Sequence, residues 1–509
     1  MLKKLPIGIQ TFSEIVENDL LYIDKTKIAL DLLENSKYVF LARPRRFGKS
    51  LFLDTLHNIF EANKILFNGL YIENKWGWET QYPVIKLSFS GNRTKHELLN
   101  SIFNQLQNNQ ERLLVDYEKS DDFAISFSRL IDKTQKKHQQ KVVILVDEYD
   151  KPILDNLDQL DVALECRDIL KRLYTQIKDN DQYIKFAMLT GVSKFSKVSV
   201  FSGLNNLEDI SLEPRYGSIC GYTENNLDID FKPYLDDIDR NEVRHWYNGY
   251  NFFGDKVYNP YDILLFIKNE KTFKNYWFET ATPSFLINLI KQNQYFLPRF
   301  ENLIVEESLT NSFEIENLSL ETVMFQSGYL TIKERIVDKR KKIAYQLDFP
   351  NYEVKISFYD YLLRLSVNVA DKTPITNTLY DILEEAQMDQ LEAILKRLFA
   401  SIAYNNFTKN NLQNYEGFYA SVLYAYFASL GLKIIAEDVT NQGRIDLTLI
   451  INDKIYIFEF KVIKENPLKQ VKEKRYFDKY SGEIYIIGIV FDAKQRNISQ
   501  FEWEKICKT

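Results

Sequence analysis

A Gly-Lys-Ser triplet near the N-terminus has the residue types needed to bind phosphate. Residues 43–50 read Arg-Pro-Arg-Arg-Phe-Gly-Lys-Ser, between the apolar run Tyr38–Ala42 and a segment with helical periodicity. In such a loop the backbone N–H groups surround phosphate oxygens, the lysine adds positive charge and the serine ligates Mg²⁺. We therefore expect five residues to bind a nucleotide: Arg46, Phe47, Gly48, Lys49 and Ser50. The alternative is a helix that begins with a solvated lysine, and Arg43 stands where the general pattern has glycine.

Two adjacent carboxylates follow a second apolar run, Val142–Val146. Parallel strands carry such residues to the carboxyl edge of a sheet, where ligands bind. There Asp147, together with Ser50, would hold Mg²⁺, and Glu148 would orient or deprotonate an attacking water. Thr190, at the end of a later run, could sense the γ-phosphate. The alternatives are that Asp147 and Glu148 cap the following helix and that Thr190 caps its strand.

A third set of chemically capable residues lies near the C-terminus. Asp446 lies in one apolar run, and Glu459 and Lys461 lie in the next, which gives the pattern Asp-x₁₂-Glu-x-Lys. Glu459 and Lys461 are two apart on a strand and so share a face. On adjacent strands, Asp446 and Glu459 could hold Mg²⁺ against a scissile phosphate while Lys461 polarises the attacking water. The alternative is a buried ion pair that closes a sheet.

The elements that must position the first two motifs are short apolar runs separated by helical stretches. Continuous apolar strands that alternate with helices predict a parallel sheet covered on both faces, hence an α/β domain over residues 1–215. The runs are Tyr38–Ala42, Val84–Phe89, Val142–Val146, Tyr183–Leu189 and the weaker Asp209–Leu212.

The remaining chain has two parts that differ in predicted secondary structure. Residues 216–404 are mostly helical, as in Pro260–Lys268 and Ile382–Ala403, with strand-like pieces such as Gly328–Lys333, and we expect a helical lid or a winged-helix-like linker. Residues 405–509 predict an α-β-β-β-α-β unit. Its first helix carries Glu416 and its second carries Gln470 and Lys474. The segment Lys461–Lys479 has a net charge of +4, which could meet phosphates or could be a solvated face.

Composition excludes several classes of protein. The 509 residues, 45% hydrophobic and 27% charged, fit a globular protein of about three domains. A net charge of -6 excludes a chain-wide basic field, and three cysteines and four histidines without ligand spacing make a zinc site a poor expectation. The most apolar stretch, Phe418–Leu432, is too short for a bilayer span, and the N-terminus lacks a signal-like apolar run. We expect a soluble cytoplasmic protein without membrane contact.

Several stretches together resemble a known family, the bacterial and archaeal AAA-ATPase-like proteins with a C-terminal PD-(D/E)XK nuclease-like domain. The resemblance runs over nearly the whole chain, and the Arg-rich form of the loop is typical of that family. The resemblance implies ATP as the nucleotide. The stretches are Pro6–Phe12, Leu21–Thr26, Arg43–Leu56, Leu145–Ile153, Thr190–Leu212, Trp246–Phe252, Val257–Leu264, Phe325–Lys333 and Leu347–Val354.

Two functions are compatible with these motifs. The first is an enzyme, an ATPase coupled to a Mg²⁺-dependent nuclease that acts on DNA or RNA. The second is a switch in which ATP changes the conformation and the C-terminal domain binds nucleic acid or a partner without cleavage. The intact Asp446, Glu459 and Lys461 favour the enzyme, whereas the acidic net charge and the lack of a recognisable arginine finger keep the switch open. The sequence does not define the oligomeric state.

Overall fold

The computed structural model describes residues 2–91, 94–116, 120–194, 200–201, 203–277, 286, 300–307, 319–366 (backbone alone at 364–366), 378–400, 416–462 and 466–506. The chain divides into two compact units. The first contains residues 1–286 and 302–351, and the second contains residues 287–301 and 352–509. The segment expected to form a middle region, 216–404, is therefore shared between them. The domain boundaries drawn from the sequence stay a prediction.

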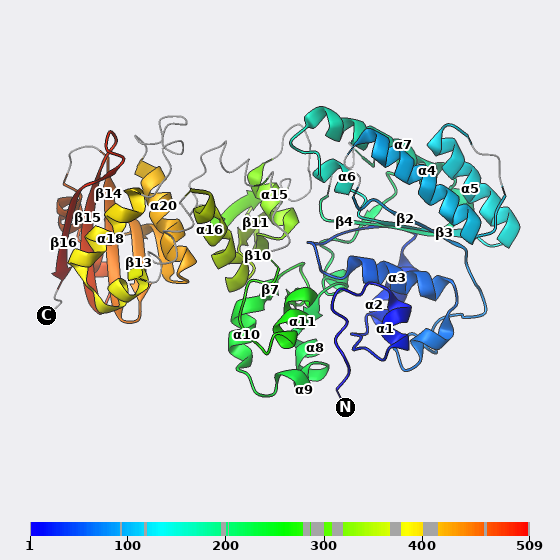
Figure 1. Ribbon diagram of the computed structural model, residues 1–509, viewed down its shortest axis with the longest axis horizontal. Coiled ribbons are helices and arrows are strands. Elements are labelled where there is room, and N and C mark those ends of the chain that lie inside the picture. Colours follow the sequence, from blue (N-terminus) through cyan, green and yellow to red (C-terminus); the bar gives the residue numbers. More distant parts are fainter. Residues whose placement is uncertain are drawn as a thin grey trace. The chain divides into compact units, whose positions relative to one another are not determined.

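The first unit is built on a five-stranded parallel sheet in the order β2-β3-β4-β1-β5 (Figure 1). The predicted parallel-sheet α/β fold is confirmed. The continuous apolar runs become strands because both faces of the sheet are covered. The strands are β1 (Tyr38–Ala42), β2 (Val84–Ser88), β3 (Val142–Asp147), β4 (Ile184–Gly191) and the short β5 (Glu208–Asp209).

Helices cover both faces of this sheet. Helices α4, α5 and α7 lie over one face, and α1, α2 and α3 lie on the other side (Figure 1). Because β1 leads directly into α3, the Gly-Lys-Ser loop lies at the carboxyl edge, beside the ends of β3 and β4. The helices are α1 (Phe12–Glu17), α2 (Thr26–Asn35), α3 (Lys49–Phe60), α4 (Lys95–Arg112), α5 (Phe123–His138), α6 (Lys151–Leu154) and α7 (Leu160–Asp179).

The free edge of β2 is covered by side chains of α4. Asn109 accepts from Lys86 N at 3.1 Å and donates to Lys86 O at 2.8 Å, and Gln105 makes the same pair of bonds with Ser88 at 2.6 and 2.8 Å. Arg112 donates to the Val84 carbonyl. Side chains at i, i+4 and i+7 of the helix thus replace a neighbouring strand, which protects this edge from pairing with another chain.

The rest of the first unit contains two small antiparallel sheets, β6-β8-β7 and β10-β11-β9. The expected helix over Pro260–Lys268 is present as α11. Strands and helices are β6 (Tyr222–Thr223), α8 (Glu224–Ile229), α9 (Lys232–Leu235), α10 (Arg240–Tyr247), β7 (Asn248–Tyr250), β8 (Val257–Tyr258), α11 (Pro260–Lys268), β9 (Leu303–Glu306), α15 (Leu320–Ser327), β10 (Thr331–Val337) and β11 (Ile343–Asp348).

The second unit contains a five-stranded sheet in the order β12-β13-β14-β15-β16, in which only β14 and β15 are parallel. The predicted α-β-β-β-α-β order is present, and β16 extends it by a strand that the sequence analysis did not predict. The elements are α16 (Tyr352–Ser366), α18 (Met388–Ala400), α20 (Glu416–Ser429), β12 (Lys433–Thr440), β13 (Gly443–Ile451), β14 (Lys454–Lys461), α21 (Pro467–Glu473), β15 (Glu483–Asp492) and β16 (Asn497–Ile506).

Within the described ranges, none of the helices combines the length and the apolar character that crossing a membrane requires.

Candidate functional site

The loop between β1 and α3 has the backbone shape of a phosphate-binding turn. Arg43 N continues the β1–β4 ladder through a bond to Gly191 O at 3.1 Å, after which the chain leaves the sheet. Arg46 and Gly48 have φ values of 68° and 93°, in the left-handed region. Gly48 has no heavy atom within 4 Å of the position a Cβ would take, so its outer side is open. The loop therefore presents an open concave side next to the first N–H groups of α3.

Lys49 lies inside this concavity. Its Nζ donates to the carbonyls of Arg43 at 2.9 Å and Pro44 at 3.0 Å. Burial lowers the pKa of Lys49, and the negative charge of Asp147 partly offsets that effect. The ammonium is thus held by neutral carbonyls rather than by an ion pair, which leaves its charge available to an anionic ligand.

Asp147 and Thr190 end neighbouring strands and contact each other. Thr190 Oγ1 donates to Asp147 Oδ1 at 2.7 Å. Asp147 and Ser50 both line a cleft of about 580 Å³, whose other polar lining includes Asp54 and Lys86. The structure therefore brings together the hydroxyl and the carboxylate expected to hold a metal ion, with the Thr190 hydroxyl beside them.

Glu148 is held in an unfavourable conformation. Its φ of 52° lies in the left-handed region, which costs a non-glycine residue about 1–2 kcal/mol. Glu148 Oε2 is buried and has no hydrogen-bond partner among the residues that the structure describes, and burial together with the charge of Asp147 raises the pKa of Glu148. A strained carboxylate with an unpaired oxygen is typical of a functional residue.

Asp150, the alternative carboxylate two residues after Glu148, uses its Oδ2 oxygen to hold the loop after β4. It accepts from Val192 N at 3.0 Å, Ser193 N at 2.6 Å and Ser193 Oγ at 2.5 Å. Gly191 makes room for it, since a Cβ there would lie 2.5 Å from Asp150 Oδ1. Asp150 thus fixes the loop after β4 and does not compete with Glu148 for a role at the ligand.

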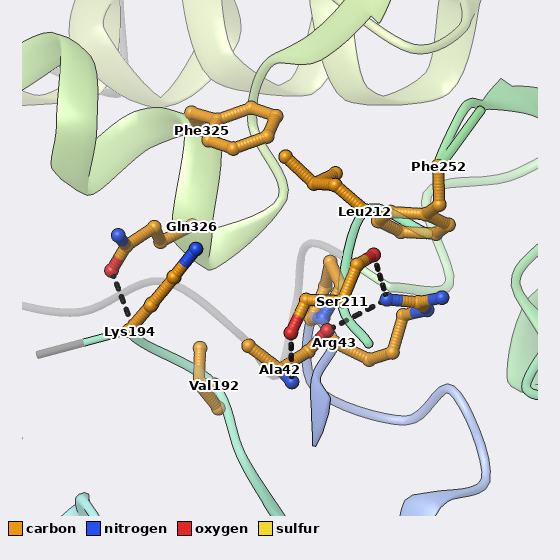
Figure 2. Close-up of a pocket in the computed structure, with 10 residues that line it drawn as sticks. Ala42, Arg43, Val192, Lys194, Ser211, Leu212, Phe252, Phe325 and Gln326 are labelled. Carbon is orange, nitrogen blue, oxygen red and sulfur yellow. Dashed lines mark hydrogen bonds between the residues drawn. The ribbon is translucent and has the colours of Figure 1, made fainter. Parts of the chain in front are cut away.

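Arg43 explains the missing glycine of the loop. Its guanidinium is buried and donates to the carbonyls of Ala42 at 2.9 Å and Ser211 at 2.6 Å (Figure 2). It also donates to the carbonyl of Tyr216 at 3.0 Å. It also lies 3.9 Å from the ring centroid of Phe252, beside a cavity of about 40 Å³. Since the φ of Arg43 is not positive, glycine is not required there, and the arginine ties the loop to the segment after β5.

Aromatic side chains that the sequence analysis did not single out hold the outer part of the loop. Phe47 packs edge-on against Tyr250 with centroids 4.8 Å apart, and the Arg46 guanidinium lies 3.8 Å from the ring centroid of Tyr261. Asn259 and Trp277 both donate to the Arg45 carbonyl, at 3.4 and 3.3 Å. Most of these aromatic residues lie in the stretches Trp246–Phe252 and Val257–Leu264. No sequence pattern indicates that these stretches pack against the loop.

In the second unit, β13 and β14 bring the three expected residues together. The antiparallel register pairs Leu447 with Phe458, so Asp446 lies beside Glu459 at the end of the ladder. Asp446 Oδ2 accepts from Phe460 N at 2.8 Å. Lys461 Nζ lies 3.4 Å from Glu459 Oε1, which is possible because the two residues share a face of β14.

The electrostatics of this cluster favour a cationic ligand. Glu459 is 1% exposed, and burial together with the charge of Asp446 raises its pKa to about 8. Burial also raises the pKa of Asp446. Burial alone would lower the pKa of Lys461, but the charges of Glu459 and Asp446 raise it overall. Glu459 Oε2 is buried without a partner, so the residues present fit a divalent metal ion with oxygen ligands.

The neighbouring helices contribute as expected only in part. Gln470 Nε2 donates to Glu459 Oε1, and Glu416 lies 3.5 Å from Lys461 Nζ. Lys474 lies over the ring of Tyr476 instead. Besides Lys461, four described basic residues of this segment form ion pairs with carboxylates: Lys469 with Glu473, Lys472 with Glu504, Arg475 with Asp478, and Lys479 with Asp438. In the described part of the chain, no cluster of three or more His, Cys, Asp or Glu side chains is arranged to hold a metal ion.

Comparison with known proteins gives the same two-part organisation. Residues 6–201 match the family described as a predicted AAA-ATPase, and residues 414–501 match the PD-(D/E)XK nuclease superfamily. An uncharacterized protein in the vnfD 5′ region of Azotobacter chroococcum mcd 1 is 46% identical over 515 residues, with 99% of each chain covered. The solved structure of the Aeropyrum pernix ORC1 protein in complex with DNA covers 70% of this chain and 97% of that chain. Its sequence identity is 12% and its TM-score is 0.26, values too low to show a shared fold.

The two family matches agree with the resemblance found in the sequence, and the Azotobacter relative matches this chain over 99% of its length. The chain belongs to the family of predicted AAA-ATPases that carry a C-terminal domain of the PD-(D/E)XK nuclease superfamily.

Proposed function

We propose that this protein binds and hydrolyses ATP at the loop of residues 43–50, and that this activity controls a Mg²⁺-dependent nuclease site in the second unit that cuts DNA or RNA. The observation that carries the proposal is the convergence of charged and hydroxyl side chains where adjacent strands end, in both units. In the first unit these are Lys49, Asp147 and Thr190, and in the second they are Asp446 and Glu459.

At the nucleotide site, this chain's own residues divide the work. Lys49 exchanges its two carbonyl partners for phosphate oxygens, which are stronger acceptors because they are charged. Ser50 and Asp147 would hold Mg²⁺, whose charge would stabilise the phosphate oxygens. Glu148 takes a proton from the attacking water, and its raised pKa brings it closer to neutral pH, where a general base is most effective.

At the nuclease site, Asp446 and Glu459 would hold Mg²⁺, which when bound stabilises the charge that develops on the scissile phosphate. Gln470 orients the Glu459 carboxylate through its hydrogen bond to Oε1. Lys461, which donates to the Phe460 carbonyl at 2.9 Å, lies beside the carboxylates where it can polarise the attacking water. A carboxylate with one oriented and one free oxygen supports metal binding at this position.

Two variants test the nucleotide site. Lys49→Ala removes the charge that faces the phosphates, and ATP affinity should fall by about tenfold or more, since a charge-assisted contact contributes about 1.5–3 kcal/mol. Glu148→Gln keeps the shape of the side chain but not its basicity, so ATP should bind while phosphate release falls about 10²-fold. Calorimetry and a phosphate-release assay measure these effects. Unchanged ATP affinity of Lys49→Ala would refute the nucleotide site.

A third variant tests the nuclease site. The wild-type protein should produce fragments from at least one of single-stranded DNA, double-stranded DNA and RNA in the presence of Mg²⁺, and Asp446→Ala should abolish them while ATP binding stays intact. Binding of nucleic acid without fragments would favour the second candidate function, a switch that recognises its target without cutting it. Fragments from Asp446→Ala equal to those of the wild type would mean that the activity lies elsewhere.

A further inference from the structure

The stretch Leu21–Thr26, Leu-Tyr-Ile-Asp-Lys-Thr, has no role in the function proposed above. Its outer polar residues build a turn. Asp24 Oδ1 accepts from Thr26 N at 2.8 Å and from Thr26 Oγ1 at 2.7 Å, and Asp24 Oδ2 accepts from Tyr71 N at 2.8 Å. Thr26 Oγ1 in turn accepts from Ile72 N at 3.2 Å. Asp24 and Thr26 are thus explained as the residues that fix this turn, whereas Lys25 between them is not.

Lys25 has weak partners. Its Nζ donates to Asn226 Oδ1 at 3.4 Å, close to the limit of a hydrogen bond. That oxygen already accepts from Thr223 N and Thr223 Oγ1, both at 3.0 Å, in the cap of α8. In the ranges that the structure describes, no carboxylate lies within ion-pair distance of Lys25. A partly buried ammonium is therefore left with one long hydrogen bond to a neutral oxygen.

The side chain of Lys25 reaches α8, and the segment just before α8 contacts the nucleotide-binding loop. Gly221 N donates to Phe47 O at 3.2 Å, which ties the segment before α8 to that loop. The thiol of the preceding residue, Cys220, lies in the field of three positive charges, those of Arg43, Lys49 and Lys25. Lys25 and Lys49, which lie on two different elements, thus both act electrostatically on Cys220.

The positive charge near Lys25 and Cys220 favours the binding of an anion. Burial lowers the pKa of Lys25 to about 8, and the groups that oppose this effect are Cys220, Asp230 and Asp24. Burial also raises the pKa of the Cys220 thiol, which is therefore neutral and offers no negative charge. Asp230 and Asp24 therefore offset only part of the cost of burying the Lys25 ammonium, and a bound anion would lower that cost further.

We propose that Lys25 is a second lysine of the nucleotide site, which binds phosphate oxygens of ATP together with Lys49. This inference rests on the proposed function, because it assumes that ATP binds to the loop of residues 43–50. It gives the Asp-Lys-Thr stretch a purpose: two residues build a turn so that the third reaches the ligand.

The test compares the full-length wild-type protein with Lys25→Met, Lys25→Arg and the control Lys27→Met. Lys27 is exposed, lies two residues away and loses the same charge in its variant. With Mg²⁺ and ATP in the calorimeter, we expect Lys25→Met to lose tenfold or more in affinity, Lys27→Met to keep the wild-type affinity and Lys25→Arg to recover part of the loss. Without nucleotide, Lys25→Met should unfold at the same or a higher temperature than the wild type, since it removes a buried charge.

A second readout is the proton balance of binding. Burial lowers the pKa of Lys25, and an anion bound beside it would favour the charged form. At pH 8 the wild-type protein should therefore take up more protons per bound ATP than Lys25→Met, as measured by calorimetry in buffers of different ionisation enthalpy. Because Lys49 is present in both proteins, its own proton uptake cancels in the difference.

The outcomes separate the two proposals. If wild-type protein does not bind ATP, the proposed function fails. If wild-type protein binds ATP and Lys25→Met binds it equally well with the same proton balance, only the role of Lys25 is overturned. A Lys25→Met protein that unfolds at a lower temperature without nucleotide, while Lys25→Arg shows normal stability and normal affinity, would assign Lys25 a structural role and would also overturn the inference.

Discussion

The substitution Glu459→Gln should have opposite effects on the second unit in the absence and presence of metal. The raised pKa of Glu459 means that the folded protein retains a proton that the unfolded chain releases, so wild-type stability falls as the pH rises from 4.5 to about 8. At pH 7 the difference extends over 2.5 pH units, and at about 1.4 kcal/mol per unit it costs the folded state about 3 kcal/mol. Glutamine has no such cost.

Part of this gain is offset. The buried Oε2 position becomes an amide NH₂ without an acceptor, which costs about 1–2 kcal/mol. In metal-free buffer we therefore expect Glu459→Gln to be about 1–2 kcal/mol more stable than the wild type. With Mg²⁺ at 100 times its dissociation constant, the wild type should gain about 2.7 kcal/mol and the variant nothing, so the order reverses.

Hydrogen exchange of peptides from β14 measures this effect in the full chain, since melting of a two-unit protein is not a two-state process. The matched control is Glu483→Gln, in the same sheet, where Lys505 lowers the pKa of the carboxylate and no metal effect is expected. Lower stability of Glu459→Gln in metal-free buffer, with no response of the wild type to Mg²⁺, would show that Glu459 and Lys461 form a structural ion pair and would refute the reasoning.

Further predictions concern the first unit. Arg43→Met should lower the free energy of unfolding of this unit by about 2–4 kcal/mol, because three buried carbonyls lose a donor. Arg43→Lys should restore little of this loss, because one ammonium group cannot span the three carbonyls. If calorimetry shows that Arg43→Met is as stable as the wild type, this prediction is wrong. Burial lowers the pKa of His57, but its contacts with Asp54 and Glu61 raise it overall. The stabilisation by protonated His57 should therefore be complete below pH 6.5 and be lost as the pH rises through the raised folded value, and His57→Gln should abolish this pH dependence in denaturant titrations at pH 6 and pH 8.5. Gln470→Ala should weaken Mg²⁺ binding at the second site about tenfold without abolishing it, as followed by the Mg²⁺ dependence of β14 exchange, because it removes only the group that orients Glu459.

The large sheet of the first unit was predictable because its strands are buried on both faces. Tyr38–Ala42 matches β1 at both ends, and the three other long runs match within one or two residues at each end. Strand β16 was missed because it is an edge strand in which polar and charged residues interrupt the apolar ones, so it lacks an apolar run. The helix expected from Ile382 is interrupted at Ala386, whose φ of 56° ends one helix before α18 begins.

The site residues were predictable where the chemistry lies in one short stretch. The triplet at Gly48, the carboxylates after β3 and the Glu-x-Lys pattern of β14 each carry their own signal. The contacts of Arg43 with Ser211 and Tyr216, and the contact of Lys25 with Asn226, join residues that are far apart in the chain. The hydrophobic periodicity of the sequence does not predict such contacts, because they depend on the tertiary packing of separate elements.

The central claim is that nucleotide turnover at the first site controls cleavage at the second. The most direct measurement is the rate of nucleic-acid cleavage with Mg²⁺, with and without ATP, by the wild-type protein, Lys49→Ala and Glu148→Gln. All three have the same Asp446, Glu459 and Lys461. We predict that ATP changes the cleavage rate of the wild type, has no effect on Lys49→Ala and holds Glu148→Gln at the rate of the ATP-bound state. Identical rates for the three proteins, with and without ATP, would contradict the account.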